Sequence, residues 1–197
     1  MTSTPLPAAP GETLHTSLAL ANSAVTLTSG QHFDELGNPQ EATTWLIDHG
    51  LVPSNTALLS YCQQQLTGLR ETLRIVFSAQ VEGQTPAVHA LEHLNTTMTA
   101  APGISALRFS PGNGFARESV HPVSRLVEHA MSQLADDAAK LLSGDQAQLL
   151  AQCAAAPCDR FLLRTHARRH WCSIRCGDRV RAARAYARKN HGTTPGD

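Results

Sequence analysis

The sequence contains no apolar stretch long enough to cross a membrane, and no internal repeat or low-complexity tract. Its first thirteen residues lack both the basic segment and the apolar segment of a secretory leader. These absences exclude a helical membrane protein and a repeat architecture. We therefore expect a cytoplasmic protein in a reducing compartment, associated with the nucleoid if it binds DNA.

Cysteine is absent from the first 61 residues, and four of the five cysteines fall between positions 153 and 176. Disulfides are rare in reducing compartments, so a tight cluster of cysteines there favours metal ligands. Cys62 stands alone on the apolar face of a helical pattern. We expect it to be a buried and unreactive thiol.

The four clustered cysteines form two close pairs, Cys153-x4-Cys158 and Cys172-x3-Cys176, with thirteen residues between them. Each pair can supply two corners of a tetrahedron, so the spacing predicts one zinc ion bound by four thiolates. Four protein ligands leave no position for water, which makes the zinc structural. The segment has few apolar residues and needs a metal to fold.

A competing ligand set uses two histidines at finger-like spacing, His166-x3-His170. Only seven residues separate Cys158 from His166, too few for the strand and helix of a two-cysteine, two-histidine finger. This set would also leave Cys172 and Cys176 without a role. We therefore favour four cysteines and expect both histidines in an exposed turn.

The formal net charge of zero conceals two oppositely charged segments. Residues 1–152 carry six basic and thirteen acidic side chains, whereas residues 153–190 carry ten basic and two acidic ones. A basic segment around a metal site suggests an anionic partner, most plausibly nucleic acid. The alternative interpretation is a solvated surface without a partner.

A helix is expected after Cys176, with Asp178 as its N-cap. Its outer face would carry arginines, and its inner face Val180, Ala183, Tyr186 and Ala187. Arg179 falls on the inner side, where we expect it to bond backbone carbonyls of the metal site. The predicted DNA contacts are Arg181, Arg184 and Arg188, with Arg168, Arg169, Arg175 and Lys189 in support.

The first 145 residues are predicted to be mostly helical. Residues 15–28 could form a helix or a strand, and residues 39–49 a short helix. Ser54 is a candidate cap for a long helix that continues through Phe77. Pro86 opens a helix with Val88, Leu91, Leu94 and Met98 on one face, and Pro122 opens another that ends near Gly144.

Between these last two helices, Pro111-Gly112-Asn113-Gly114 separates two short apolar runs at 107–110 and 115–120, which predicts a hairpin. We therefore expect an α+β fold with a small antiparallel sheet. The predicted divisions are a disordered segment 1–13, a domain 14–145, a finger 146–190 and a disordered tail 191–197.

The string Trp171-Cys172-Ser173-Ile174-Arg175-Cys176-Gly177-Asp178-Arg179 resembles the CGNR zinc finger. Asp178 stands where that family has Asn, and the interval between the last two cysteines is about one residue shorter than its common form. The resemblance implies a treble-clef-like finger with one zinc that binds DNA.

The preceding region is similar to the ABATE domain, which usually accompanies this finger. The similarity rests on Leu20-Ala21-Asn22-Ser23, Asp34 with Leu36, Trp45-Leu46, residues 69–74 and the hairpin. It implies a stress-induced transcription regulator, not an enzyme. It also implies a small-molecule pocket lined by Asn22, Asp34 and Trp45, with Trp45 equally compatible with core packing.

Two other functions compete with a DNA-binding regulator. The finger could be a protein–protein interaction module. The string His89-Ala90-Leu91-Glu92-His93 matches the H-x-x-E-H signature of a metallopeptidase, but its histidines are predicted to face solvent. The sequence indicates no DNA site, effector or oligomeric state.

Overall fold

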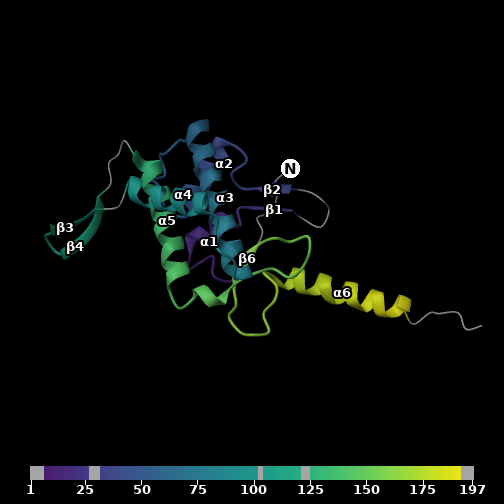
Figure 1. Ribbon diagram of the computed structural model, residues 1–197. Helices are drawn as coiled ribbons and strands as arrows, with labels where there is room; N and C mark the ends of the chain where they lie inside the picture. The colour runs from purple at the N-terminus through teal and green to yellow at the C-terminus, as the bar shows by residue number, and fades with distance from the viewer. Residues whose placement is uncertain (1–6, 27–31, 102–103, 121–124, 192–197) are drawn as a thin grey trace, which may run out of the picture.

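The computed structural model describes residues 7–26, 32–101, 104–120 and 125–191. Within these ranges helices surround one apolar core, and three separate two-stranded antiparallel sheets lie at its edges (Figure 1). The helices are α1 (Thr16–Ala21), α2 (Pro39–Asp48), α3 (Ser60–Glu82), α4 (Val88–Ala100), α5 (Leu126–Ser143) and α6 (Ile174–His191), with a short 3₁₀ turn η2 (Ala147–Leu149). The strands are β1 (Ala24–Thr26), β2 (His32–Asp34), β3 (Ile104–Ser110), β4 (Gly114–Val120), β5 (Leu150–Gln152) and β6 (Phe161–Leu163). The predicted α+β class is confirmed.

Helix α3 is the centre of the fold and contacts α1, α2, α4, α5 and β5. Its side chains Leu66, Leu69, Leu73 and Phe77 recur at steps of three and four residues and are completely buried. Burying each such side chain stabilises the fold by about 1.5–3 kcal/mol. The helix ends at Gly83, whose φ of 66° is left-handed and suits glycine.

Helix α3 begins at Ser60, five residues later than the start predicted after Ser54. The reason is tertiary, because Leu58 is buried and its backbone N–H donates to Thr43 Oγ1 at 3.0 Å. That contact ties the segment to α2 and keeps it out of the helix.

The face predicted for helix α4 is right for Leu94 and Met98 and wrong for Val88 and Leu91. Val88 and Leu91 are exposed, whereas Ala90, Leu94 and Thr97 are buried. This stripe packs against α3 and α5, the neighbours of α4.

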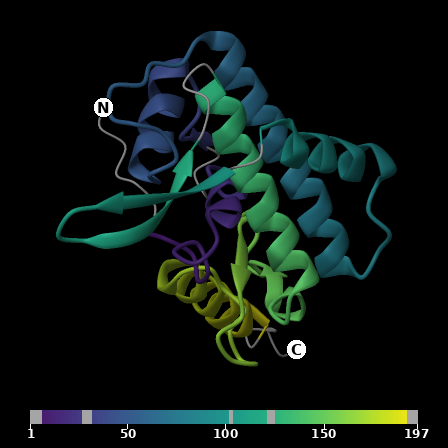
Figure 2. The same cartoon turned by 90° about the vertical axis from the view of Figure 1, so that its left-hand side faces the viewer.

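The expected hairpin is present as β3 and β4, paired from Ile104↔Val120 to Ser110↔Gly114. It projects away from the helices, and α6 projects from the opposite end of the molecule (Figures 1 and 2). Phe109 and Phe115 pair across its strands with ring centroids 5.0 Å apart, and both are exposed. Pro122, the predicted start of the next helix, lies outside the described residues, and α5 is described from Leu126.

The hairpin β5–β6 belongs to two cores at once. Side chains alternate along a strand, so Phe161 and Leu163 enter the core around α3 while Leu162 enters the cysteine cluster. Leu150 and Ala151 on β5 divide in the same way. The metal-binding segment is therefore continuous with the helical body and is not a module on a linker.

The predicted disorder of residues 1–13 is wrong for residues 7–13. The Pro10 carbonyl accepts a hydrogen bond of 2.7 Å from Leu163 N–H, and Ala9 is buried in the cysteine cluster. Gly11 has a φ of 100°, and a Cβ there would lie 2.6 Å from Leu163 Cγ. The segment is ordered because it covers β6, a partner 150 residues away in the chain. Residues 1–6 and 192–197 lie outside the described ranges.

None of the described helices combines the length and apolar character that a membrane span requires.

Candidate functional site

The four clustered cysteines converge on one point. Cys153 directly follows β5, Cys158 lies in the β5–β6 loop, Cys172 precedes α6, and Cys176 lies in the first turn of α6. Their Sγ atoms all lie within 4.8 Å of one another, and Cys172 Sγ is 3.6 Å from both Cys158 Sγ and Cys176 Sγ. Around a tetrahedral zinc with ~2.3 Å bonds, sulfurs lie about 3.8 Å apart. The cluster therefore fits one zinc ion.

The backbone around the thiols is held by hydrogen bonds that cross the site. Cys153 N–H donates to the Arg160 carbonyl at 2.8 Å, and Ala154 N–H donates to the His170 carbonyl at 2.9 Å. Ser173 Oγ accepts from Cys176 N–H at 3.2 Å, the contact of an N-cap residue. These bonds bring the two cysteine pairs together from opposite ends of the segment.

The protonation of the thiols shows why the site suits a cation. Hydrogen bonds from Cys158 and Cys172 lower the pKa of Cys153 to about 2. The resulting thiolate accepts a hydrogen bond from Cys158 and raises the pKa of Cys158 to about 12. The pKa of Cys172 is also raised, by its hydrogen bonds to Cys153 and Cys158. Several thiolates can coexist here only when a cation neutralises them, as a structural zinc does.

The two nearby histidines take no part in the cluster. His166 and His170 are both exposed, as predicted, and the four cysteines are the only metal-competent group within the described residues. With four sulfur ligands, the site leaves no coordination position for water. It is a structural metal centre.

The segment's arginines have different roles. The Arg179 guanidinium donates to the Ala155 carbonyl, as predicted for the motif's own arginine. Arg168 and Arg175 are exposed, and Arg169 is half-buried. Their contacts with DNA stay a prediction.

Arg160 is the residue that sequence reasoning missed. It is buried, donates to Glu12 Oε1 at 2.8 Å and to the Pro7 carbonyl at 2.9 Å, and lies close enough to Cys172 for their charges to interact. Burial opposes its charge, but the Glu12 carboxylate raises the pKa of Arg160 above its usual range. Its partners lie 148 and 153 residues away, so no local pattern indicates the role.

Helix α6 begins at Ile174, before Cys176, so the prediction of Asp178 as its N-cap is wrong. Ser173 and Asp178 are both residue types that cap helices well. Ser173 is the cap here because the helix starts at Ile174, which places the metal ligand Cys176 in its first turn. Asp178 instead pairs with Arg181 at 2.5 Å. Gly177 is required by Trp171, whose ring carbon Cε3 would lie 2.9 Å from a Cβ at position 177.

The distal half of α6 leaves the body of the protein. Every residue from Arg181 to Lys189 is exposed, including Tyr186 at 69 %. The predicted inner face is therefore wrong beyond Val180, which does pack against the cysteine cluster. Arg181 also lies over the Trp171 ring, 5.5 Å from its centroid.

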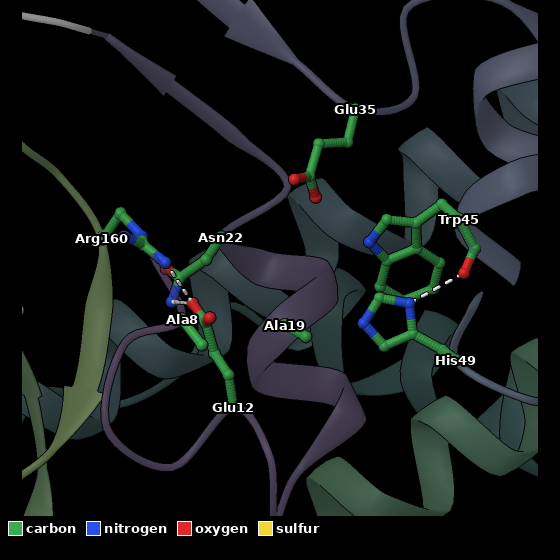
Figure 3. Close-up of a pocket in the computed structure, with 8 residues that line it drawn as sticks. All are labelled: Ala8, Glu12, Ala19, Asn22, Glu35, Trp45, His49 and Arg160. Carbon is green, nitrogen blue, oxygen red and sulfur yellow. Dashed lines mark hydrogen bonds and ion pairs between the residues drawn. The ribbon is translucent and has the colours of Figure 1, made fainter. Parts of the chain in front are cut away.

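The three predicted pocket residues separate into two sites. Asn22 and Trp45 line one cavity, with Glu12, Glu35, His49 and Arg160 (Figure 3). Asp34 does not line it. The Arg70 guanidinium donates to both Asp34 oxygens, at 2.6 and 3.0 Å, and holds β2 against α3. Although burial opposes it, this pairing lowers the pKa of Asp34.

The two remaining features singled out in the sequence are Cys62 and the H-x-x-E-H string. Cys62 is half-buried and packs against the main core. His93 Nδ1 lies 2.6 Å from Thr72 Oγ1, while His89 and Glu92 are exposed. The H-x-x-E-H string forms no metal-competent cluster among the described residues.

Comparison with known families agrees with this architecture. Residues 14–156 match the ABATE family, described as "Putative stress-induced transcription regulator", and residues 150–189 match the CGNR zinc finger. A search of curated proteins found no match. The two matched ranges overlap on β5 and Cys153, at the hairpin that both cores share. The chain belongs to the ABATE family and carries a CGNR zinc finger.

Proposed function

We propose that the protein is a DNA-binding transcription regulator whose structural zinc holds α6 in position to contact DNA. The family description and the excess of basic residues in the finger support this proposal. The N-terminal domain would sense a small molecule, and its pocket adjoins the finger.

The exposure of the distal half of α6 is the observation that carries the proposal. A helix of this size fits the major groove, and α6 stands clear of the body along residues 181–189. Arg184 and Arg188 form no ion pair with any described residue, so both can meet phosphates or base edges.

The two arginines can be tested by titrating duplex DNA at several salt concentrations. Each phosphate contact contributes about 0.9 to the slope of log K against log salt. The double substitution Arg184→Gln with Arg188→Gln should therefore reduce the slope by about 1.8 and weaken binding at low salt.

The matched control removes the same charge from the body through Arg125→Gln with Lys140→Gln, two exposed positions on α5 or beside it. This control should retain most of the wild-type slope. An equal loss in both proteins would mean that net charge alone matters, and would overturn the proposed role of α6.

Exposed apolar side chains on the same helix support the second candidate, a protein interaction module. Ile174 is 81 % exposed and Tyr186 is 69 % exposed. A partner that is captured equally well after both arginine substitutions, without any DNA binding, would favour this function.

A further inference from the structure

The pocket beside the finger is built from segments far apart in the sequence. It is a cavity of about 180 Å³ between the N-terminal segment, α1, the residues after β2, α2 and the start of β6 (Figure 3). Its polar groups include those of Glu12, Glu35, Trp45 and Arg160. Pockets for larger ligands are typically about 300–1,000 Å³, so this one fits only a molecule of a few heavy atoms.

One hydrogen-bond donor in the wall of the cavity is not fully satisfied. Trp45 is 4 % exposed, and its indole Nε1–H forms no well-aligned hydrogen bond with any described residue, although it interacts with the nearby Glu35 carboxylate. The ring is fixed, because His49 stacks on it at 3.9 Å and bonds the Trp45 carbonyl at 2.8 Å. In Figure 3 the indole nitrogen faces the side of the cavity where Glu35 lies. Buried donors are nearly always satisfied, so this one calls for a better-aligned acceptor.

The charges around the cavity do not balance. Glu12 is already engaged, because its oxygens accept from Arg160, from Asn22 Nδ2 at 2.6 Å and from Ala9 N–H at 2.8 Å. The ion pair of Glu12 and Arg160 is neutral as a whole. Glu35 is half-buried, and burial together with the Glu12 charge raises its pKa, although the Arg160 charge and the Trp45 indole oppose part of that rise. A second positive group placed beside Glu35 would relieve both effects.

We propose that this cavity binds a small organic amine, whose ammonium group pairs with Glu35 and whose neighbouring oxygen accepts from Trp45 Nε1–H. The proposal rests on the proposed regulatory function, for which it supplies the class of effector. An anion is disfavoured by the two carboxylates, and a larger molecule by the volume.

The cavity has a short structural connection to the metal centre. Asn22 holds β6 by accepting from Phe161 N–H at 2.7 Å and donating to the Phe161 carbonyl at 2.8 Å. Arg160, also in the wall, accepts the Cys153 N–H at its carbonyl. A ligand that moves Arg160 therefore acts on a residue that is hydrogen-bonded to the metal ligand Cys153, and one that moves Asn22 acts on the neighbouring Phe161.

Ethanolamine is a suitable probe, because it carries one ammonium and one hydroxyl group. The zinc-loaded full chain, labelled with ¹⁵N, contains only two tryptophans and should give two indole N–H signals. Titration should shift the Trp45 signal saturably as its N–H gains an acceptor. Trp171→Phe assigns the remaining signal to Trp45, and calorimetry on the wild type provides an independent affinity if that variant folds poorly.

Glu35→Gln keeps the shape of the side chain and removes its charge, so it should weaken ethanolamine binding by at least about tenfold. Glu92→Gln, an exposed change of equal charge on α4, should leave binding unchanged. Ethanol and acetate, which lack the ammonium group, should not saturate the site. No saturable shift in the wild type, or equal binding by Glu35→Gln, would overturn the proposal.

A DNA titration with and without saturating ethanolamine tests the effector role separately. A changed DNA affinity supports it, and an unchanged affinity overturns it. Complete absence of DNA binding would refute the proposed function, whereas the indole signal would still decide whether the cavity binds an amine.

Discussion

The arginines of the finger have two different roles: some stabilise the fold, and others face solvent. Arg179 bonds a backbone carbonyl in the cysteine loop, and Arg160 neutralises Glu12 beneath it. Arg181 lies between the Trp171 ring and the Asp178 carboxylate. Arg184 and Arg188, farther along α6, are exposed without an ion pair among the described residues, and so are Arg164, Arg168 and Arg175 elsewhere in the finger.

Asp178 should therefore limit DNA binding. Asp178→Asn removes the carboxylate that pairs with Arg181 and frees the guanidinium for a phosphate. One additional phosphate contact should raise affinity by roughly tenfold at 0.1 M salt and steepen the salt slope by about 0.9. Fluorescence anisotropy with labelled duplex DNA measures both.

The control is Asp145→Asn, which makes the same charge change at an exposed position after α5. It should alter affinity much less. If the two variants gained affinity equally, the Asp178–Arg181 pair would have no specific effect on DNA binding.

At the residue scale, the sequence was sufficient where the chemistry is local. The spacing of the four cysteines predicted a site that the structure brings together. The cap of α6 was mistaken because Ser173 and Asp178 are both good caps, and only the geometry of the cluster selects Ser173. Arg160 was missed because its partners lie at the other end of the chain.

At the scale of elements, the β5–β6 hairpin determines how the finger is attached. One side of the hairpin is packed into the α3 core and the other into the cysteine cluster. Asn22 closes the edge of β6 by pairing with both backbone groups of Phe161. The finger should therefore share the stability of the helical body.

Asn22→Ala should destabilise the protein by about 2–4 kcal/mol, because it leaves the buried N–H and carbonyl of Phe161 unsatisfied. Urea unfolding followed by circular dichroism measures the change. Thr44→Ala, which removes an exposed hydrogen bond within α2, should cost much less. A loss for Asn22→Ala no larger than for Thr44→Ala would show that the edge of β6 is not held in this way.

The sequence predicts which helices and strands form better than it predicts which segments pack together. The period of α3, the turn of β3–β4 and the start of α2 at Pro39 are local signals, and all three are present. The delayed start of α3, the inner face of α4 and the ordered segment 7–13 depend on tertiary contacts. No single-sequence pattern contains those contacts, because each joins residues whose proximity only the folded chain creates.

At the scale of the whole molecule, an acidic helical body and a basic zinc-stabilised end share one continuous fold. Arg160, directly before β6, lines the cavity, and Cys153, directly after β5, belongs to the metal centre. Because β5 and β6 contribute to both cores, metal binding should stabilise the body as well as the finger. This arrangement would let an effector in the body influence a helix that contacts DNA.

The most direct test of this account is the zinc content of the purified chain, measured by mass spectrometry for three proteins. The wild type and Cys62→Ser should each contain one zinc per chain, and Cys172→Ser should contain none. Full zinc content in Cys172→Ser, or none in the wild type purified under reducing conditions, would contradict the four-cysteine metal centre.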